Sequence, residues 1–304
     1  MPVPDATASA PRPVDAMALQ RWRRRLRSAP DTPWLHAEAA RRMAERLAVV
    51  KLQPPSVLDW GLQHRHDRGL LAAAYPRARI TPVDPDGEAA AAGPAPPWWR
   101  SLLARSAEPA PLAPGAVPDG QAQLLWSSML LHTLPDPQAQ LAAWQRALAV
   151  DGFVMFCTLG PGTLQSLAAL YARAGWPAPL APLVDMHDLG DMLVQAGFAD
   201  PVMDQETLRL TWRDAEAALA ELRTLGLNAA PARGRGLRTP RWRQRLLQLL
   251  QAGSGVDGRV VLEFELVYGH AFKPLPRARL AAETSVPLDT LRSMVRRRPP
   301  EAGR

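Results

Sequence analysis

The sequence predicts an α/β fold, in which helices flank a doubly wound and mostly parallel sheet, and three observations support this prediction. First, short apolar runs alternate with segments of helical periodicity, which is typical of strand–helix–strand units. Second, two of the runs end in acidic residues, Asp59 and Asp84. Third, residues 259–268 alternate between the two faces of a half-buried strand, which we expect to pair antiparallel with residues 206–212.

The first half of the chain is expected to supply most of the sheet. Residues 35–50 are the best helix of this half, because apolar residues recur at spacings of three and four, as they do between Leu35, Ala39 and Met43. In chain order we expect helices over 17–27 and 35–50, a strand over 56–61, a helix over 67–75, a strand over 79–84, a short helix near 98–103, a strand over 122–128, a helix over 137–148, a turn at 150–152 and a strand over 153–159.

The second half is expected to be richer in helices. Asp185, Asp214 and Thr239 precede helical segments and are residue types that cap helix N-termini. We expect helices over 163–174, 186–196, 214–225 and 240–251, and strands over 206–212 and 259–268. The domain prediction is a flexible N-terminus over 1–16, one domain over 17–275 with a helical insertion at about 213–252, and a disordered Pro/Arg-rich tail over 276–304.

Composition limits the function classes. The single Cys157 excludes an intrachain disulfide and a Cys-based zinc site. No apolar run approaches the ~18 residues that span a bilayer, and the N-terminus lacks the apolar core of a signal peptide, so we expect a soluble cytoplasmic protein. We expect no metal site either, because Asp185 in the acidic segment 185–191 has a sufficient role as a helix cap.

The net charge of +7 suggests an anionic partner, yet the 36 basic residues include only two lysines, Lys51 and Lys273. This extreme preference for arginine is typical of a GC-rich coding bias, and solvated helix faces give the same clustering of arginines. A nucleic-acid-binding role is the least favoured hypothesis, because the sequence shows no nucleic-acid-binding motif.

A ligand site is expected where the first strands end. In a doubly wound sheet a nucleotide-like ligand lies across the carboxyl ends of the strands. Gly61, directly after the first strand, lets the backbone approach such a ligand, and Asp84 is placed to accept hydrogen bonds from ribose hydroxyls. The alternative for Asp59 and Asp84 is that they are only polar residues at strand ends.

Several longer segments carry a resemblance to a known family. They are residues 13–16, 57–59, 125–128, 132, 144–146, 156–163, 184–191, 196–204 and 268–274. Together they resemble class I S-adenosylmethionine (SAM)-dependent methyltransferases, and more specifically the biotin-pathway malonyl-acyl-carrier-protein O-methyltransferase subgroup. The resemblance covers roughly residues 13–277. It implies a Rossmann-like fold with an antiparallel last strand.

The resemblance implies SAM as cofactor, and the chain departs from the family pattern where SAM binds. Glycines usual in the loop after the first strand are replaced by Gln63 and Arg65, whose side chains would crowd the cofactor and tolerate positive φ poorly. Ser106 stands where an acidic residue is usual, and Ser128 where an Asn is usual. The implied cofactor-binding residues are Asp59, Gly61, Gln63, Asp84, Ser106 and Ser128.

The implied reaction is methylation of the free carboxylate of a malonyl thioester on acyl-carrier protein, early in biotin biosynthesis. A carboxylate is already ionised at pH 7, so the enzyme must align the reactants and needs no strong general base. Arg24 and Arg25 are candidates for positioning an anionic substrate; His132 either faces the substrate or packs as a satisfied polar group. The acidic carrier protein is expected to dock on Arg235, Arg238, Arg241, Arg243 and Arg245.

The departures from the pattern leave an alternative function open. A methyltransferase-fold protein that has lost SAM binding can serve as a non-catalytic partner or assembly factor. The sequence favours the SAM-dependent O-methyltransferase over this alternative.

Overall fold

The structure is a computed structural model, and its first compact unit, Met1–Pro274, holds a central sheet and the helices packed on it. The second unit is Leu275–Arg304. Residues 12–87, 109–234, 238–255 and 257–276 are described. The short helix expected near 98–103 and the tail expected from 277 onward lie outside these ranges.

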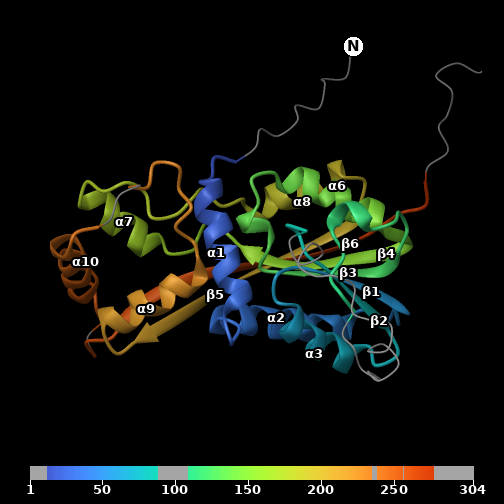
Figure 1. Ribbon diagram of the computed structural model, residues 1–304, viewed down its shortest axis with the longest axis horizontal. Coiled ribbons are helices and arrows are strands. Elements are labelled where there is room, and N and C mark those ends of the chain that lie inside the picture. Colours follow the sequence, from blue (N-terminus) through green and yellow to red (C-terminus); the bar gives the residue numbers. More distant parts are fainter. Residues whose placement is uncertain (1–11, 88–108, 235–237, 256, 277–304) are drawn as a thin grey trace, which may run out of the picture. The chain divides into compact units, whose positions relative to one another are not determined.

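A six-stranded sheet runs through the described part of the first unit in the order β2-β1-β3-β4-β6-β5 (Figure 1). Its strands are β1 (Ser56–Trp60), β2 (Arg79–Val83), β3 (Ala122–Ser128), β4 (Leu148–Leu159), β5 (Ala199–Trp212) and β6 (Val260–Phe272). The pairs β1–β2, β1–β3 and β3–β4 are parallel, whereas β6 is antiparallel to both β4 and β5. The predicted fold class, with its antiparallel last strand, is therefore confirmed.

Helices cover both faces of this sheet. They are α1 (Ala16–Ser28), α2 (Trp34–Arg46), α3 (His64–Ala74), α6 (Pro137–Ala147), α7 (Gln165–Arg173), α8 (Met186–Gln195), α9 (Ala215–Leu225) and α10 (Pro240–Ala252), with short 3-10 turns η1 (Leu47–Val49), η2 (Pro114–Ala116) and η3 (Leu131–Thr133). α2 and α3 lie on one face and α6 and α8 on the other (Figure 1). Side chains of the strands alternate between these two layers, as the pleat requires.

The alternation is clearest in the central strands. Leu124 and Trp126 of β3 belong to the core beneath α2 and α3, whereas Leu125 belongs to the core beneath α6 and α8. In β4, Met155 and Phe156 divide in the same way. Both faces of these strands are buried, which explains why their sequences are almost continuously apolar.

The expected helix caps are formed. The side chain of Asp185 accepts a hydrogen bond from the His187 amide at 2.8 Å. Asp214 accepts from the Ala217 amide at 2.8 Å, and Thr239 accepts from the Trp242 amide at 3.2 Å. Each cap satisfies an amide that the first turn of a helix leaves without a partner.

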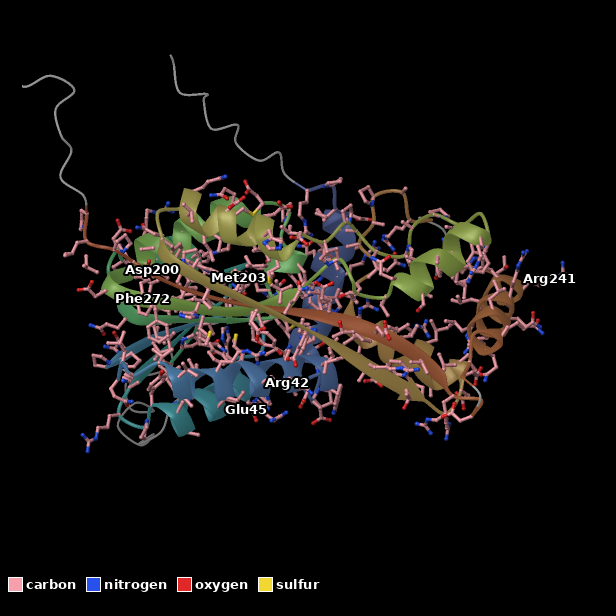
Figure 2. The ribbon with its side chains drawn as sticks, turned by 180° about the vertical axis from the view of Figure 1, so that it is seen from behind. Arg42, Glu45, Asp200, Met203, Arg241 and Phe272 are labelled. Carbon is pink, nitrogen blue, oxygen red and sulfur yellow. The ribbon has the colours of Figure 1, made fainter. Side chains whose placement is uncertain are left out.

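Two strands begin earlier than the sequence predicts. β5 begins at Ala199, although 206–212 was the expected strand, because residues 202–206 pair with β6 despite their polar sequence. β4 begins at Leu148, and the expected turn at 150–152 is a local irregularity within it, with Asp151 at φ +60°. Figure 2 shows the paired strands from behind, with Asp200 and Met203 on β5 and Phe272 on β6.

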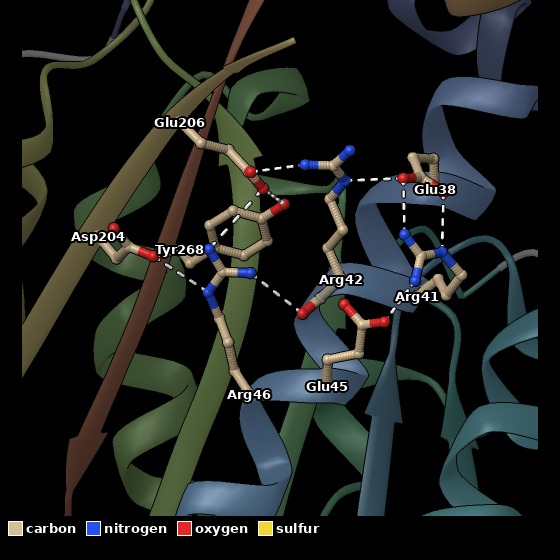
Figure 3. Close-up of polar contacts among 8 residues, drawn as sticks. All are labelled: Glu38, Arg41, Arg42, Glu45, Arg46, Asp204, Glu206 and Tyr268. Atoms are coloured by element: carbon tan, nitrogen blue, oxygen red, sulfur yellow. Dashed lines mark hydrogen bonds and ion pairs between the residues drawn. The ribbon is translucent and has the colours of Figure 1, made fainter.

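Ion pairs with α2 explain the polar sequence of the early part of β5 (Figure 3). Arg42 lies 2.6 Å from Glu206, and Arg46 lies 2.6 Å from Asp204. The Tyr268 hydroxyl on β6 donates to Glu206 at 2.6 Å, and the Arg46 guanidinium stacks 3.6 Å above the Tyr268 ring centroid. This cluster links α2 to the last two strands, β5 and β6.

Candidate active site

Asp59 lies near the end of β1, and Gly61 directly follows that strand. Asp59 is 1% exposed; its Oδ2 lies 2.8 Å from Nδ1 of His64, and its Oδ1 has no hydrogen-bond partner among the described residues. A Cβ added to Gly61 would meet nothing closer than the Ser128 carbonyl oxygen at 3.9 Å. The site therefore offers an unpaired buried acceptor beside a glycine that has room for a Cβ above its backbone.

Asp59 controls the charge of its neighbours. Burial lowers the pKa of His64, but the charge and hydrogen bond of Asp59, together with the charge of Asp84, outweigh it and raise that pKa. Asp67 is buried on α3, and burial together with the charge of Asp59 raises its pKa well above the ordinary value. Burial therefore favours the protonated form of Asp67.

The loop after β1 holds the two residues that replace glycines. Gln63 has φ −114° and directly precedes α3, and Arg65 lies in the first turn of that helix. Neither is among the positive-φ residues of the described chain. The expected conflict with positive φ does not arise, because α3 begins at His64 and gives both residues ordinary backbone angles.

Asp84 follows β2, and two arginines of α1 reach it and Asp86. Arg27 lies 2.5 Å from Asp84 and 2.6 Å from Asp86. Arg23 lies 2.5 Å from Asp86 and donates to the Thr133 carbonyl at 2.9 Å. Asp84 therefore sits at the predicted edge of the sheet, but α1 engages its carboxylate.

Ser128 ends β3 at the same edge. Its hydroxyl lies 3.5 Å from the Cys157 sulfur, so the side chain contacts the neighbouring strand β4. Burial raises the pKa of the Cys157 thiol to about 12. Ser106, the remaining predicted cofactor residue, lies outside the described residues.

His132 is buried in η3, beneath α1. Its Nδ1 lies 3.3 Å from the Thr158 hydroxyl, and its Nε2 has no partner among the residues described. Burial lowers the pKa of His132 well below its usual value, and nearby His36 and Arg12 lower it further. The imidazole is therefore neutral near pH 7.

Arg24 and Arg25 are exposed on α1, on a different face from Arg23 and Arg27. Both line a cavity of about 820 Å³ between α1, α7 and α9. Sequence reasoning singled out these two arginines and missed Arg23 and Arg27. The i, i+4 spacing of that missed pair, together with two acidic residues at 84 and 86, was the available signal.

The predicted docking arginines do not share one environment. Arg243 pairs with Glu216 at 3.2 Å, while Arg238 lies 4.6 Å above the Trp242 ring centroid. Arg241 projects from α10 (Figure 2). Arg235 falls outside the residues that the structure describes.

Comparison with known proteins gives this arrangement its context. No family model matches the chain. A malonyl-[acyl-carrier protein] O-methyltransferase from Laribacter hongkongensis is 38% identical over 257 residues, covering 81% of this chain and 84% of the relative. The protein of the same name from Gallionella capsiferriformans is 36% identical, covering 80% and 85%. The chain belongs to the malonyl-acyl-carrier-protein O-methyltransferase family.

This membership confirms the family predicted from the sequence. A further relative of the same name, from Methylovorus, is 34% identical over 261 residues. Among solved structures, the YcgJ protein of Bacillus subtilis aligns with a TM-score of 0.51 at 12% identity, covering 79% of this chain and 99% of that one. At that identity the likeness concerns the fold alone.

The residues at the strand ends fit the cofactor that a class I methyltransferase uses. Asp59 supplies an unpartnered buried acceptor, Gly61 leaves room above the backbone, and Asp84 supplies a carboxylate one strand away. Arg27 already engages the Asp84 carboxylate, so a ligand hydroxyl bound there would share it with Arg27. Two acidic side chains therefore lie at this edge, and α1 engages one of them.

The described ranges contain neither a cluster that could bind a metal ion nor a helix that could span a membrane. No group of three or more His, Cys, Asp or Glu side chains there could hold a metal ion. No helix there combines the length and apolar composition needed to cross a bilayer.

Proposed function

We propose that this chain is a SAM-dependent O-methyltransferase that methylates the free carboxylate of a malonyl group carried as a thioester on acyl-carrier protein. This is the early step of biotin biosynthesis that the family resemblance implies. The observation that carries the proposal is the 38% identity to a relative of that name over 81% of the chain. The buried acceptors at the ends of β1 and β2 support it from the geometry.

The chain's own residues would hold the cofactor at the strand ends. When bound, SAM supplies an activated methyl group. Asp84 would accept hydrogen bonds from ribose hydroxyls, and Asp59 would present its unpartnered Oδ1 to a donor of the same ligand. Gly61 would let the ligand approach the backbone, with Gln63 beside it at the start of α3.

The protein's remaining task is alignment of the acceptor carboxylate, since that group is ionised at pH 7 without a base. His132 is not needed as a base for this reaction. Its buried, neutral imidazole contacts the Thr158 hydroxyl. Its Nδ1 contact with Thr158 favours packing, whereas its unpartnered Nε2 leaves the substrate-facing alternative as a prediction. Arginines of α1 are better placed to neutralise an anionic substrate.

The direct test measures cofactor binding and methyl transfer separately. Titration of the full chain with S-adenosylhomocysteine in a calorimeter should show saturable binding below millimolar concentration, and D84N should weaken it at least tenfold. Incubation with SAM and malonyl-acyl-carrier protein should then add one methyl group by mass spectrometry. Acetyl-acyl-carrier protein, which lacks the free carboxylate, should remain unmodified.

Two results would overturn the proposal in different ways. Absence of binding at millimolar ligand would favour the non-catalytic partner. Binding without methyl transfer to malonyl-acyl-carrier protein would retain the cofactor site and reject the acceptor. The cytoplasmic location and the carrier-protein docking face stay predictions.

A further inference from the structure

The cavity of about 820 Å³ lies against α1, on a different face of that helix from Arg23 and Arg27, which pair with Asp86 and Asp84. Leu164 and Leu167, which follow the carboxyl end of β4, form one wall. Leu219 and Leu222 of α9 form another, and α1 closes the third side. Its volume lies within the range typical of small-ligand sites.

The charge of this cavity is one-sided. Arg21, Arg24, Arg25, Arg223 and Arg233 line it, and no Asp or Glu is among the described residues of its lining. Arg233 is paired with Asp15 at 2.8 Å, but Arg24, Arg25 and Arg223 have no ion-pair partner among the described residues. Unpaired guanidinium groups around an apolar chamber are suited to carboxylates and phosphates, which they bind in a bidentate manner.

α1 is fixed firmly enough to hold these arginines in place. Trp22 is 3% exposed and donates from its indole nitrogen to the Thr224 carbonyl at 3.1 Å. It packs against Gly226, where an added Cβ would overlap the indole. On another face of the helix, Arg23 and Arg27 pair with Asp86 and Asp84. The helix therefore touches both the strand-end site and the cavity.

We infer that this cavity binds the phosphopantetheine arm of an anionic acyl thioester, with the apolar walls around the arm and Arg24 and Arg25 on its anionic groups. The inference rests on the proposed function, which it deepens by assigning a place to the substrate. The cavity adjoins the carboxyl end of β4, so an arm lying in it would deliver its acyl group toward the cofactor edge. Arg24 and Arg25 are then substrate-positioning residues.

The test uses malonyl-4′-phosphopantetheine as the probe, with the full-length chain and isothermal calorimetry. The double variant R24Q/R25Q should weaken binding at least tenfold. The matched control R77Q/R79Q removes the same charge from exposed positions at the opposite edge of the sheet, and should change binding less than twofold. L222W, which fills the cavity without changing its charge, should also weaken binding at least tenfold.

The anionic group that the arginines hold is identified with acetyl-4′-phosphopantetheine and malonyl-pantetheine, which lack the carboxylate and the phosphate respectively. If the arginines bind one of these groups, the probe that lacks it should bind R24Q/R25Q and the wild-type chain with nearly equal affinity. In turnover assays R24Q/R25Q should raise KM for malonyl-acyl-carrier protein more than it lowers kcat. S-adenosylhomocysteine binding should remain within twofold of wild type.

Unchanged probe affinity in both R24Q/R25Q and L222W would overturn the inference, even where methyl transfer proceeds normally. Equal weakening in the control R77Q/R79Q would overturn it too, because general charge attraction would then explain the binding. Loss of probe affinity in the cavity variants of a chain that fails to methylate would instead reject the proposed function and leave the binding site standing.

Discussion

The buried histidine His36 gives the sharpest prediction about stability. It lies on α2 at 2% exposure, its ring is 6.1 Å from that of Trp22, and neither ring nitrogen has a hydrogen-bond partner among the described residues. Burial lowers the pKa of His36 from 6.5 to about 4. The unfolded chain therefore binds more protons than the folded chain between those two pH values, and stability must fall as pH falls through this window.

The size of the effect follows from the shift in the pKa of His36. Each pKa unit corresponds to about 1.4 kcal/mol, so the contribution is negligible at pH 7, about 2 kcal/mol at pH 5 and about 3 kcal/mol below pH 4. His132 acts in the same direction, because its pKa is also lowered by burial. The substitution H36F removes the His36 contribution and keeps an aromatic ring against Trp22.

The assay is urea unfolding at pH 7, 6 and 5 for the wild type, H36F and the control H187F. His187 is exposed on α8, so its replacement removes a histidine without altering a buried site. The free energy of unfolding of H36F, relative to wild type, should rise by about 2 kcal/mol between pH 7 and pH 5. Parallel pH profiles for H36F and the wild type would refute the reasoning.

Three further predictions concern the site and its support. G226A should destabilise the chain by at least about 2 kcal/mol in urea, because Gly226 has φ +66° and its Cβ would overlap Trp22; a wild-type midpoint would contradict this. R27M should lower the melting temperature without ligand, and S-adenosylhomocysteine should restore more of it than in wild type, since ribose hydroxyls can satisfy Asp84. Cys157 should resist iodoacetamide at pH 8 until urea unfolds the chain, because burial raises its pKa to about 12; rapid labelling of folded protein would count against this.

Much of the site's framework could be predicted because it depends on strand direction. Asp59 lies near the end of β1 and Asp84 follows the parallel neighbour β2, and such strands end at one edge whatever packs around them. The orientation of Ser128 could not be predicted in this way. Its hydroxyl contacts Cys157 on the neighbouring strand β4, 29 residues away in sequence, and the local sequence carries no signal for that contact.

The sequence by itself determined the alternation of strands and helices, the helix caps at Asp185, Asp214 and Thr239, and the antiparallel pairing of the last two strands. The alternation and the caps follow from residues close together in the chain, through periodicity and local hydrogen bonds, whereas the pairing is predicted from the two alternating faces of residues 259–268. Only the tertiary structure decided that α1 joins the strand-end site to the arginine-lined cavity. That decision rests on Arg27 meeting Asp84 and Trp22 meeting Thr224, pairs separated by 57 and 202 residues, which only the packed core brings together.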